Sequence, residues 1–223
     1  MMVEFLYPEL TNLLGENGSL LLLTQIFGED QVLSTSFPQK PHFLEEKVDL
    51  VYMGNMTEEK QKLILELLLP YKKEIKEKIE EGQFFLFTGN ALDLLGTTIE
   101  HEEGETLEAL GLFDFKTKVA KYKRTNAFVH GQTQKGAEVF GFISQFTSYQ
   151  GEMPPLVQSQ GKGYGIHYKN LYATSLLGPL LITSPYFTKE LLQEMGMPTT
   201  LPKEESMMAA FKRRKEQLLE NTR

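Results

Sequence analysis

The stretch of this chain with the clearest potential for chemistry is Phe84–Gly96, in which four apolar residues meet a Thr-Gly-Asn turn and then a second apolar segment. A buried strand that ends in a tight turn and a helix start is a common place for a site in an α/β protein. Side chains and backbone N–H groups project there from the carboxyl ends of parallel strands. We therefore expect the site around Thr88, Gly89 and Asn90.

Plainer roles are also open for the residues of this turn. Gly89 fits a turn that needs a positive φ, which glycine adopts without strain. Thr88 fits a hydrogen-bonded hydroxyl at a strand end. As a nucleophile Thr88 would need a strong base, and the sequence shows none beside it.

The spacing of the histidines and of the acidic run Glu100–Glu105 along the sequence does not indicate a metal site. His42, His101 and His130 lack metal-ligand spacing to one another, and we interpret them as hydrogen-bonded structural residues. His167 has two possible roles, since it could face a ligand or be a hydrogen-bonded structural residue like the others. Glu100–Glu105 lacks the alternating ligands of a calcium loop and is interpreted as a solvated loop. We expect no metal and no cofactor.

Composition narrows the class of protein. The chain has 223 residues, 41% of them hydrophobic, and a net charge of -7. This charge argues against broad binding to nucleic acid, and the basic run Lys212–Lys215 is interpreted as a solvated helix end. The chain has no cysteine, which removes disulfides, thiolate nucleophiles and thiolate metal sites. The longest aliphatic run, Leu20–Leu23, is too short to span a membrane, so we expect a cytoplasmic protein.

The first half of the chain has the pattern of a parallel sheet. Strands are predicted at Val3–Tyr7, Gln31–Ser36, Val48–Met53 and Phe84–Phe87. Helices are predicted at Leu20–Phe27 and at Tyr71–Glu81, which follows Pro70. A further helix is predicted to begin after Thr57, which is its N-cap. Leu20–Phe27 fits a helix or a strand by pattern, and Ser19 or Asn17 as N-cap favours a helix. The strand, helix, strand order predicts that Val48–Met53 and Phe84–Phe87 are neighbouring inner strands, with Gly54 and Gly89 at one edge.

The second half has shorter apolar runs that are typical of antiparallel strands. These runs are Phe113–Phe115, Lys118–Tyr122, Ala127–His130 and Val139–Phe146, followed by a hairpin candidate at Gly161–Gly165 and a strand-like stretch, Leu171–Leu181, broken at Gly178. Thr188 is the predicted cap of a helix to Met195. Residues 197–223 form a predicted helical tail, with its helix at Glu204–Asn221, beyond a domain over residues 1–196. Its stripe of Met207, Met208 and Phe211 is interpreted as a face docked on the same chain, with a partner contact as the alternative.

Several segments, in order, carry a resemblance to a known family. They are Tyr7–Leu23, Asp49–Glu58, Gly89–Gly96, Leu107–Phe113 and His167–Leu181. Together they resemble class I glutamine amidotransferases, specifically the cobyric-acid-synthase (CobB/CobQ) branch that includes GatD-like subunits of lipid II isoglutaminyl synthase. The resemblance implies a flavodoxin-like α/β fold: a mostly parallel central sheet flanked by helices, with an antiparallel β-rich second half.

The family's chemistry uses a cysteine thiolate at a strand-to-helix elbow, a histidine base, and backbone N–H groups for the oxyanion. An ungapped match from Leu94-Leu95-Gly96 places the cysteine position at Gly89, and a slip of one residue places it at Thr88. The histidine position falls on Leu177, and a Gly-Phe-Glu-x-His-like stretch becomes Gly141–Gln145. The resemblance thus implies a remnant pocket made of Gly54, Asn55, Met56, Thr88, Gly89, Asn90, Ser144, Gln145 and Leu177, without the reactive groups.

Two functions follow from the resemblance. The first is a catalytically degenerate amidotransferase-like protein that serves as a binding or regulatory subunit. The alternative is an active amidotransferase subunit that supplies ammonia to a synthetase, for cell-wall precursor or cobyric acid amidation, by using Thr88, Ser175 or a side chain from a partner.

The resemblance also implies a protein partner, such as a Mur-ligase-like or other synthetase subunit, and a small-molecule ligand in the pocket is a further possibility. The surface expected to dock the partner is made of Asn55–Glu59, Gln145–Tyr149 and Gly161–His167, with Phe146, Tyr149 and Tyr164 as anchors. The alternative for these aromatic residues is that they close the pocket.

Overall fold

The central sheet has six strands in the order β13-β14-β4-β3-β1-β2. The computed structural model describes residues 1–102 and 104–220. The strands are β1 (Val3–Leu6), β2 (Val32–Thr35), β3 (Leu50–Met53), β4 (Phe84–Thr88), β13 (Ile166–Tyr168) and β14 (Leu171–Thr174). Every neighbouring pair is parallel except β13 with β14. The predicted mostly parallel sheet is confirmed.

Strands β3 and β4 are direct neighbours, as the sequence predicts. Met53 lies opposite Phe87, so Gly54 and Gly89 leave the sheet at the same edge. The crossover between the two strands is α2 (Glu58–Leu68), a 3-10 turn at Leu69–Tyr71 and α3 (Lys72–Glu80). The Thr57 hydroxyl caps α2 by accepting the Lys60 N–H, and Pro70 lies in the turn that ends it.

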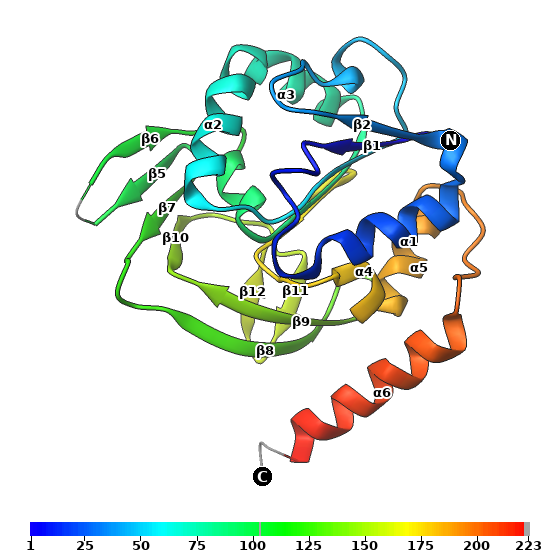
Figure 1. The fold of residues 1–223 in the computed structure, drawn as a ribbon. Coiled ribbons are helices and arrows are strands. Elements are labelled where there is room, and N and C mark those ends of the chain that lie inside the picture. The colour runs from blue at the N-terminus through cyan, green and yellow to red at the C-terminus, as the bar shows by residue number, and fades with distance from the viewer. Residues whose placement is uncertain (103, 221–223) are drawn as a thin grey trace.

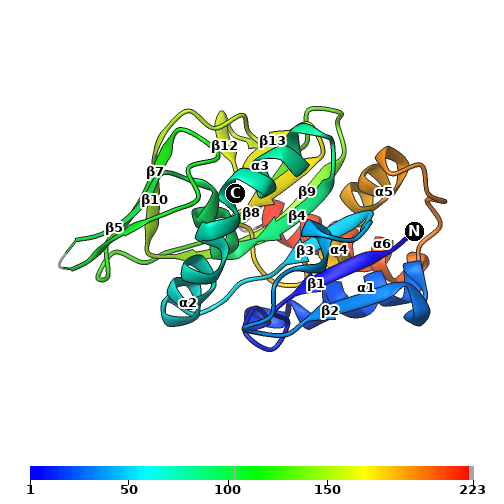
Figure 2. The ribbon, with the colours of Figure 1, turned by 90° about the horizontal axis from the view of Figure 1, so that it is seen from above.

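Helices cover both faces of the sheet. In Figure 1, α2 and α3 lie above it, whereas α1 (Asn17–Phe27), α4 (Leu180–Thr183) and α5 (Pro185–Glu194) lie below. Alternate residues of each strand supply the two cores, because side chains of a strand point to opposite faces. Figure 2, seen from above, shows β13, β4, β3, β1 and β2 following one another across the sheet. This layering leaves the carboxyl edge of the sheet available for a site.

Two predicted helix caps are wrong. Leu20–Phe27 is helical, but α1 begins at Asn17, and its N-cap residue, Glu16, makes no side-chain cap bond. A preceding 3-10 turn delivers the chain to Glu16 already in helical conformation, so Ser19 and Asn17 lie inside the helix. Thr188 also lies inside its helix, where its hydroxyl donates to the carbonyls of Leu181 and Ser184.

The second half contains two more sheets, in the orders β10-β7-β5-β6 and β12-β11-β8-β9. Their strands are β5 (Thr98–His101), β6 (Thr106–Glu108), β7 (Phe115–Val119), β8 (Thr125–Gln132), β9 (Glu138–Gln145), β10 (Thr147–Gly151), β11 (Val157–Ser159) and β12 (Lys162–Tyr164). All of their pairings are antiparallel except β5 with β7. The predicted β-rich half and the hairpin at Gly161 are confirmed.

Parts of the β-rich half differ from the sequence-based expectation. Glu100 is not in a solvated loop but in β5, where its carboxylate pairs with Lys116 at 3.2 Å. Ile99 of β5 is fully buried and holds the strand against the core. The acidic residues that follow Ile99 gave no sign of a strand in the sequence. The predicted strands Phe113–Phe115 and Lys118–Tyr122 are misplaced, because a single strand, β7, begins at Phe115 and ends at Val119, and a turn follows.

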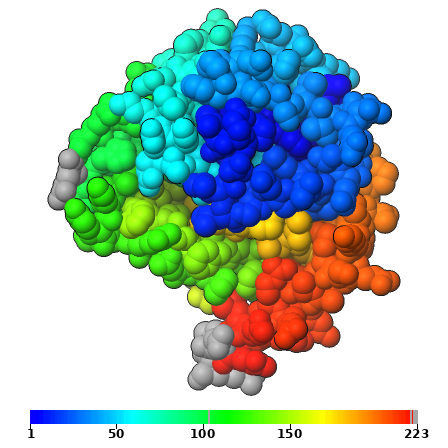
Figure 3. Space-filling view, in the orientation of Figure 1, coloured from blue at the N-terminus to red at the C-terminus, as the bar shows by residue number. Residues whose placement is uncertain are grey.

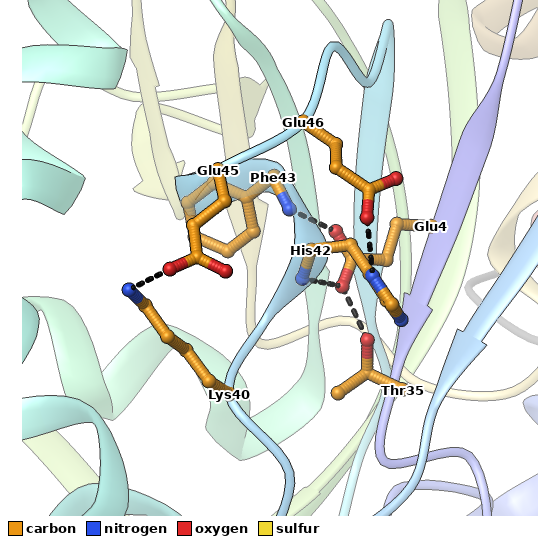
Figure 4. Close-up of polar contacts among 7 residues, drawn as sticks. All are labelled: Glu4, Thr35, Lys40, His42, Phe43, Glu45 and Glu46. Atoms are coloured by element: carbon orange, nitrogen blue, oxygen red, sulfur yellow. Dashed lines mark hydrogen bonds and ion pairs between the residues drawn. The ribbon is translucent and has the colours of Figure 1, made fainter.

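A buried carboxylate fixes the connection between β2 and β3 (Figure 4). Glu4 of β1 is fully buried and accepts the backbone N–H groups of His42 and Phe43, each at 2.7 Å, and the Thr35 hydroxyl. The His42 ring itself pairs with Glu46 at 3.2 Å on the surface. His42 therefore has the structural role that the sequence suggested.

The terminal helix α6 (Glu204–Glu220) lies along the lower side of the molecule in Figures 1 and 3. Met207 and Phe211 are buried, and the Phe211 ring contacts His130, Phe140 and Tyr186. The stripe thus docks on the same chain. Asn221, the predicted end of this helix, lies outside the described residues. None of the described helices is long and apolar enough to cross a membrane.

Candidate functional site

The elbow after β4 has the backbone geometry of a strand-to-helix turn. Gly89 has φ +61, and a 3-10 helix runs from Gly89 to Leu95. A positive φ favours glycine, so the turn role expected of Gly89 is confirmed. Thr88, one residue earlier, is fully buried.

A cavity of about 300 Å³ opens beside this elbow. It is lined by most of the residues predicted for the remnant pocket, namely Asn55, Met56, Gly89, Asn90, Ser144, Gln145 and Leu177. Gly54 and Thr88 are buried and are not among the residues that line it. The structure therefore brings together residues of β9 and of the segments that follow β3, β4 and β14.

Asn55 lies where a side chain on residue 89 would project. An ideal Cβ built on Gly89 would lie 2.3 Å from Asn55 Oδ1 and 2.5 Å from Asn55 Cβ, which is too close for any real contact. The same Oδ1 accepts the backbone N–H of Asn90 at 3.0 Å. In a nucleophile elbow the N–H after the nucleophile is an oxyanion donor. Here that donor already has an acceptor.

The second candidate oxyanion donor is also satisfied within the chain. The Met56 N–H donates to Asn90 Oδ1 at 3.0 Å, and Asn90 Nδ2 donates back to the Met56 carbonyl at 2.9 Å. This reciprocal pair joins the loop after β3 to the loop after β4. An oxyanion hole requires donors that are free to bind a developing negative charge. The Met56 and Asn90 N–H groups are not free in this arrangement.

The position expected for a base holds an aliphatic residue that is part of the scaffold. Leu177 is buried, lines the cavity, and donates its N–H to the Phe142 carbonyl at 2.8 Å. The cavity lining, taken over the described residues, contains none of the four histidines. His167 stacks on Tyr172 with ring centroids 4.5 Å apart, and His130 pairs with Glu138 at 2.7 Å.

A buried carboxyl that the sequence did not reveal lies behind the elbow. Glu16 is fully buried and accepts the Tyr52 hydroxyl, which lies 3.4 Å from Thr88 Oγ1. Burial raises the pKa of Glu16 to about 7. The only sequence signal for Glu16 was its place in Tyr7–Leu23, one of the segments that carry the family resemblance. Glu16 also hydrogen-bonds the side chain of Thr88, which is fully buried as well.

A second buried carboxyl, Asp93, lines the cavity itself. It accepts hydrogen bonds from Gln61 Nε2 at 3.2 Å and from the Thr117 hydroxyl at 3.4 Å, and it also bonds to Tyr149. Burial raises the pKa of Asp93 to about 7, so this carboxyl is partly protonated at neutral pH. Asp93 is not among the residues predicted for the site, because its neighbours in sequence are all apolar.

A larger cavity, of about 580 Å³, adjoins the first. The two share Gln145, Thr147, Tyr149 and Ser175 in their linings. Gln145 Oε1 is buried and has no hydrogen-bond partner among the described residues. Residues of all three segments predicted to dock a partner line one cavity or the other, so the fold brings those segments to one surface.

Comparison with known proteins gives the family. Residues 24–184 match the CobB/CobQ-like glutamine amidotransferase domain. The GatD subunit of lipid II isoglutaminyl synthase (glutamine-hydrolyzing) from Staphylococcus aureus is 30% identical over 161 residues, which cover 67% of this chain and 64% of that protein, slightly less than two thirds of its length. The same subunit from Streptococcus pneumoniae is 24% identical over 229 residues, covering 93% of this chain and 86% of that one.

Solved structures agree on the fold. A glutamine amidotransferase superposes with a TM-score of 0.57 at 13% identity, over 88% of this chain and all (100%) of the other. One from Thermotoga maritima gives 0.52 at 13% identity, over 98% and 94%. With the elbow, the sheet order and the family match taken together, this chain belongs to the CobB/CobQ-like glutamine amidotransferase domain family.

Proposed function

We propose that this chain is a catalytically silent amidotransferase-family protein that acts as a binding or regulatory subunit. The observation that carries the proposal is the position of Asn55, whose side chain fills the space of a nucleophile on residue 89 and accepts the N–H of Asn90. Glutamine hydrolysis needs a strong nucleophile, a base and free oxyanion donors. The chain has no cysteine, and Leu177 lines the cavity where the base is expected.

One observation favours the alternative, an active subunit with an unusual nucleophile. Ser175 lines both cavities and hydrogen-bonds Tyr149, which in turn bonds Asp93. Ser175, Tyr149 and Asp93 are thus hydrogen-bonded in the order of a nucleophile, a proton relay and an acid. However, burial raises the pKa of Tyr149 well above its ordinary value, so the hydroxyl stays protonated and is a poor base. Thr88 is fully buried, with no exposed surface for an incoming substrate.

An electrophilic glutamine analogue separates the two functions. The purified protein is incubated with the analogue and its intact mass is measured, with Ser175→Ala as the matched control. The silent-protein proposal predicts no adduct on either form. An adduct on the wild type that disappears in Ser175→Ala would establish Ser175 as a nucleophile and reject the proposal.

The partner proposal is supported by the two GatD relatives, which are named as subunits of a glutamine-hydrolyzing synthase. We assign to this chain a partner of the synthetase type, docked at the mouth of the two cavities. Phe146 and Tyr164 lie there half-buried, each with a cation over its ring: Arg124 at 5.4 Å from the Phe146 centroid and Lys162 at 5.2 Å from the Tyr164 centroid. Aromatic residues of this kind commonly dominate interface energies.

Co-purification with the synthetase-type subunit of a GatD-containing enzyme tests this contact. Phe146→Ala and Tyr164→Ala are each expected to reduce recovery of the partner, by about tenfold if either is a hot spot. Leu21→Ser, which changes an exposed apolar residue on α1, is the control and should leave recovery unchanged. Equal recovery with all variants would show that the cavity mouth is not the contact.

A further inference from the structure

The outer face of the β8–β9 hairpin is only half covered by the part of the chain that the structure describes. Residues directly opposite each other in the two strands share a face, so Phe128 and Phe142 form one pair and His130 and Phe140 the next. The inner residues, such as Val129 and Ile143, are buried in the core. On the outer face Phe140 is buried as well, whereas Phe128 is exposed.

Helix α6 covers one end of this outer face. Phe211 contacts His130 and Phe140, with ring centroids 6.1 Å and 6.5 Å apart, and Lys215 pairs with Glu138 at 2.6 Å. Figure 1 shows α6 reaching the hairpin from the side of α5. Helix α6 therefore covers the outer face of the hairpin at His130 but not at Phe128.

The uncovered end presents aromatic rings to solvent. Phe128 is 62% exposed, although its ring lies 5.1 Å from the Phe142 ring and stacks at 5.9 Å on Phe140. Phe142 is half-buried and pairs through its backbone with Leu177, a residue of the cavity wall. The aromatic surface thus continues from the cavity to α6, and the exposed ring is fixed by its neighbours.

Two guanidinium groups flank the aromatic surface. Arg124 donates through Nε to Ser144 Oγ at 2.9 Å, and Arg214 lies 5.7 Å from the centroid of Phe140. Neither arginine pairs with a carboxylate within residues 1–102 and 104–220. Lys121 and Lys123 add charge in the turn that carries Arg124. This local excess of cations stands out in a chain of net charge -7.

We infer that this surface, made of Arg124, Phe128, Phe142 and Arg214, binds a segment of a protein partner that carries an apolar side chain flanked by carboxylates. The apolar side chain packs on the Phe128 ring, and the carboxylates meet the guanidinium groups, a pairing that gives orientation as well as attraction. Of its residues only Arg124 also borders the cavity mouth, where it lines the first cavity and lies over Phe146, so the surface adjoins the contact assigned above and extends it toward α6. The inference does not depend on the loss of catalysis.

A protein segment fits better than nucleic acid or a second copy of the chain. Single-stranded nucleic acid needs a cationic groove along its backbone, whereas here Glu138 lies on the same face and the chain is acidic overall. A second copy would bring its own cations against Arg124 and Arg214 if the two faces met symmetrically. A segment with apolar and acidic side chains can pack on the exposed ring and pair with the guanidinium groups at the same time.

Fluorescence anisotropy with a short labelled peptide in which Phe and Leu are flanked by Glu tests the inference. The wild type is expected to bind it, and binding should weaken as salt is added because exposed charges are screened. Phe128→Ser should weaken binding about tenfold, and Arg124→Gln and Arg214→Gln about threefold each. The matched control is Leu21→Ser, since Leu21 is 64% exposed on α1, and it should bind as the wild type does.

Four results would overturn the inference. They are no binding of the acidic peptide, equal binding of a peptide with each Glu replaced by Lys, tighter binding of oligo-dT, or a dimer in sedimentation that Phe128→Ser dissociates. The arginine variants change polar surface groups, so they keep the test decisive if Phe128→Ser does not fold. Circular dichroism of each variant checks the fold.

Discussion

Asn55 and Gly89 share one space at the carboxyl edge of the central sheet. A Cβ on residue 89 would lie 2.3 Å from Asn55 Oδ1, and the elbow is closed further because that oxygen accepts the Asn90 N–H at 3.0 Å. The backbone of the elbow is that of a nucleophile turn, with φ +61 at Gly89. An asparagine side chain of the chain itself fills that turn.

The first prediction concerns this shared space. Gly89→Ala is expected to destabilise the protein by roughly 2–4 kcal/mol, because it adds left-handed backbone strain and an overpacked contact. In an Asn55→Gly background the same change should cost only about 1–2 kcal/mol, the strain alone. Urea unfolding of the two single variants and the double variant measures this coupling. Additive effects would show that Asn55 does not occupy the space.

The second prediction concerns the Asn90 amide. Asn55→Ala removes its acceptor, so hydrogen exchange at the Asn90 N–H should accelerate by about tenfold or more as that group opens to the cavity. The Leu13 N–H, which donates to the Asn55 backbone carbonyl at 3.1 Å, is the internal control and should keep its protection. Unchanged exchange at Asn90 would mean that its protection comes from elsewhere.

The third prediction concerns pH. Burial raises the pKa of Glu16 from 4.5 and of Asp93 from 3.8, each to about 7, so the folded state binds more protons than the unfolded state between those values. Stability from these groups is full below about pH 4 and is lost as the pH rises through about 7.

Glu16→Gln and Asp93→Asn remove these buried charges, so the unfolding free energy of each variant should fall less than that of the wild type between pH 5 and 8. Glu152→Gln, on the surface, is the control. A wild-type free energy that rises over this range, with the variants parallel to it, would exclude a raised pKa for both groups.

The fourth prediction concerns the Glu4 cluster. Glu4→Gln keeps the shape but sets an NH₂ group against an N–H donor, so it should cost roughly 2–3 kcal/mol of unfolding free energy. His42→Ala, which removes only an exposed pair with Glu46, should cost less than about 1 kcal/mol. Urea unfolding compares the two. A loss for Glu4→Gln no larger than that for His42→Ala would show that the carboxylate does not fix the β2–β3 connection.

The sequence could predict those parts of the fold that depend on local pattern. The strands at Val48–Met53 and Phe84–Phe87 and the cap at Thr57 follow from apolar runs and a local hydrogen bond, and the structure confirms them. The α1 cap could not be predicted, because the turn before Glu16 depends on contacts with distant segments such as the Asn55 carbonyl.

The site was less visible than the fold. Glu16 and Asp93 are isolated acids in their segments, and only burial by other elements makes them notable. The contact between Asn55 and the elbow joins residues that are far apart in the sequence and also depends on a side-chain rotamer. No pattern in the sequence specifies such a contact. The glycine at position 89 indicated only that the elbow carries no nucleophilic side chain there.

The most direct test of the account is ammonia release from glutamine by the purified wild-type protein, alone and with a synthetase-type partner. Neither sample should exceed the background rate, and Gly89→Cys with Leu177→His should also stay near it, because Asn55 still fills the elbow and its oxyanion donors stay occupied. The loss of a single oxyanion donor typically costs about a hundredfold to a thousandfold in turnover. Glutamine-dependent ammonia release by the unmodified protein would contradict the account.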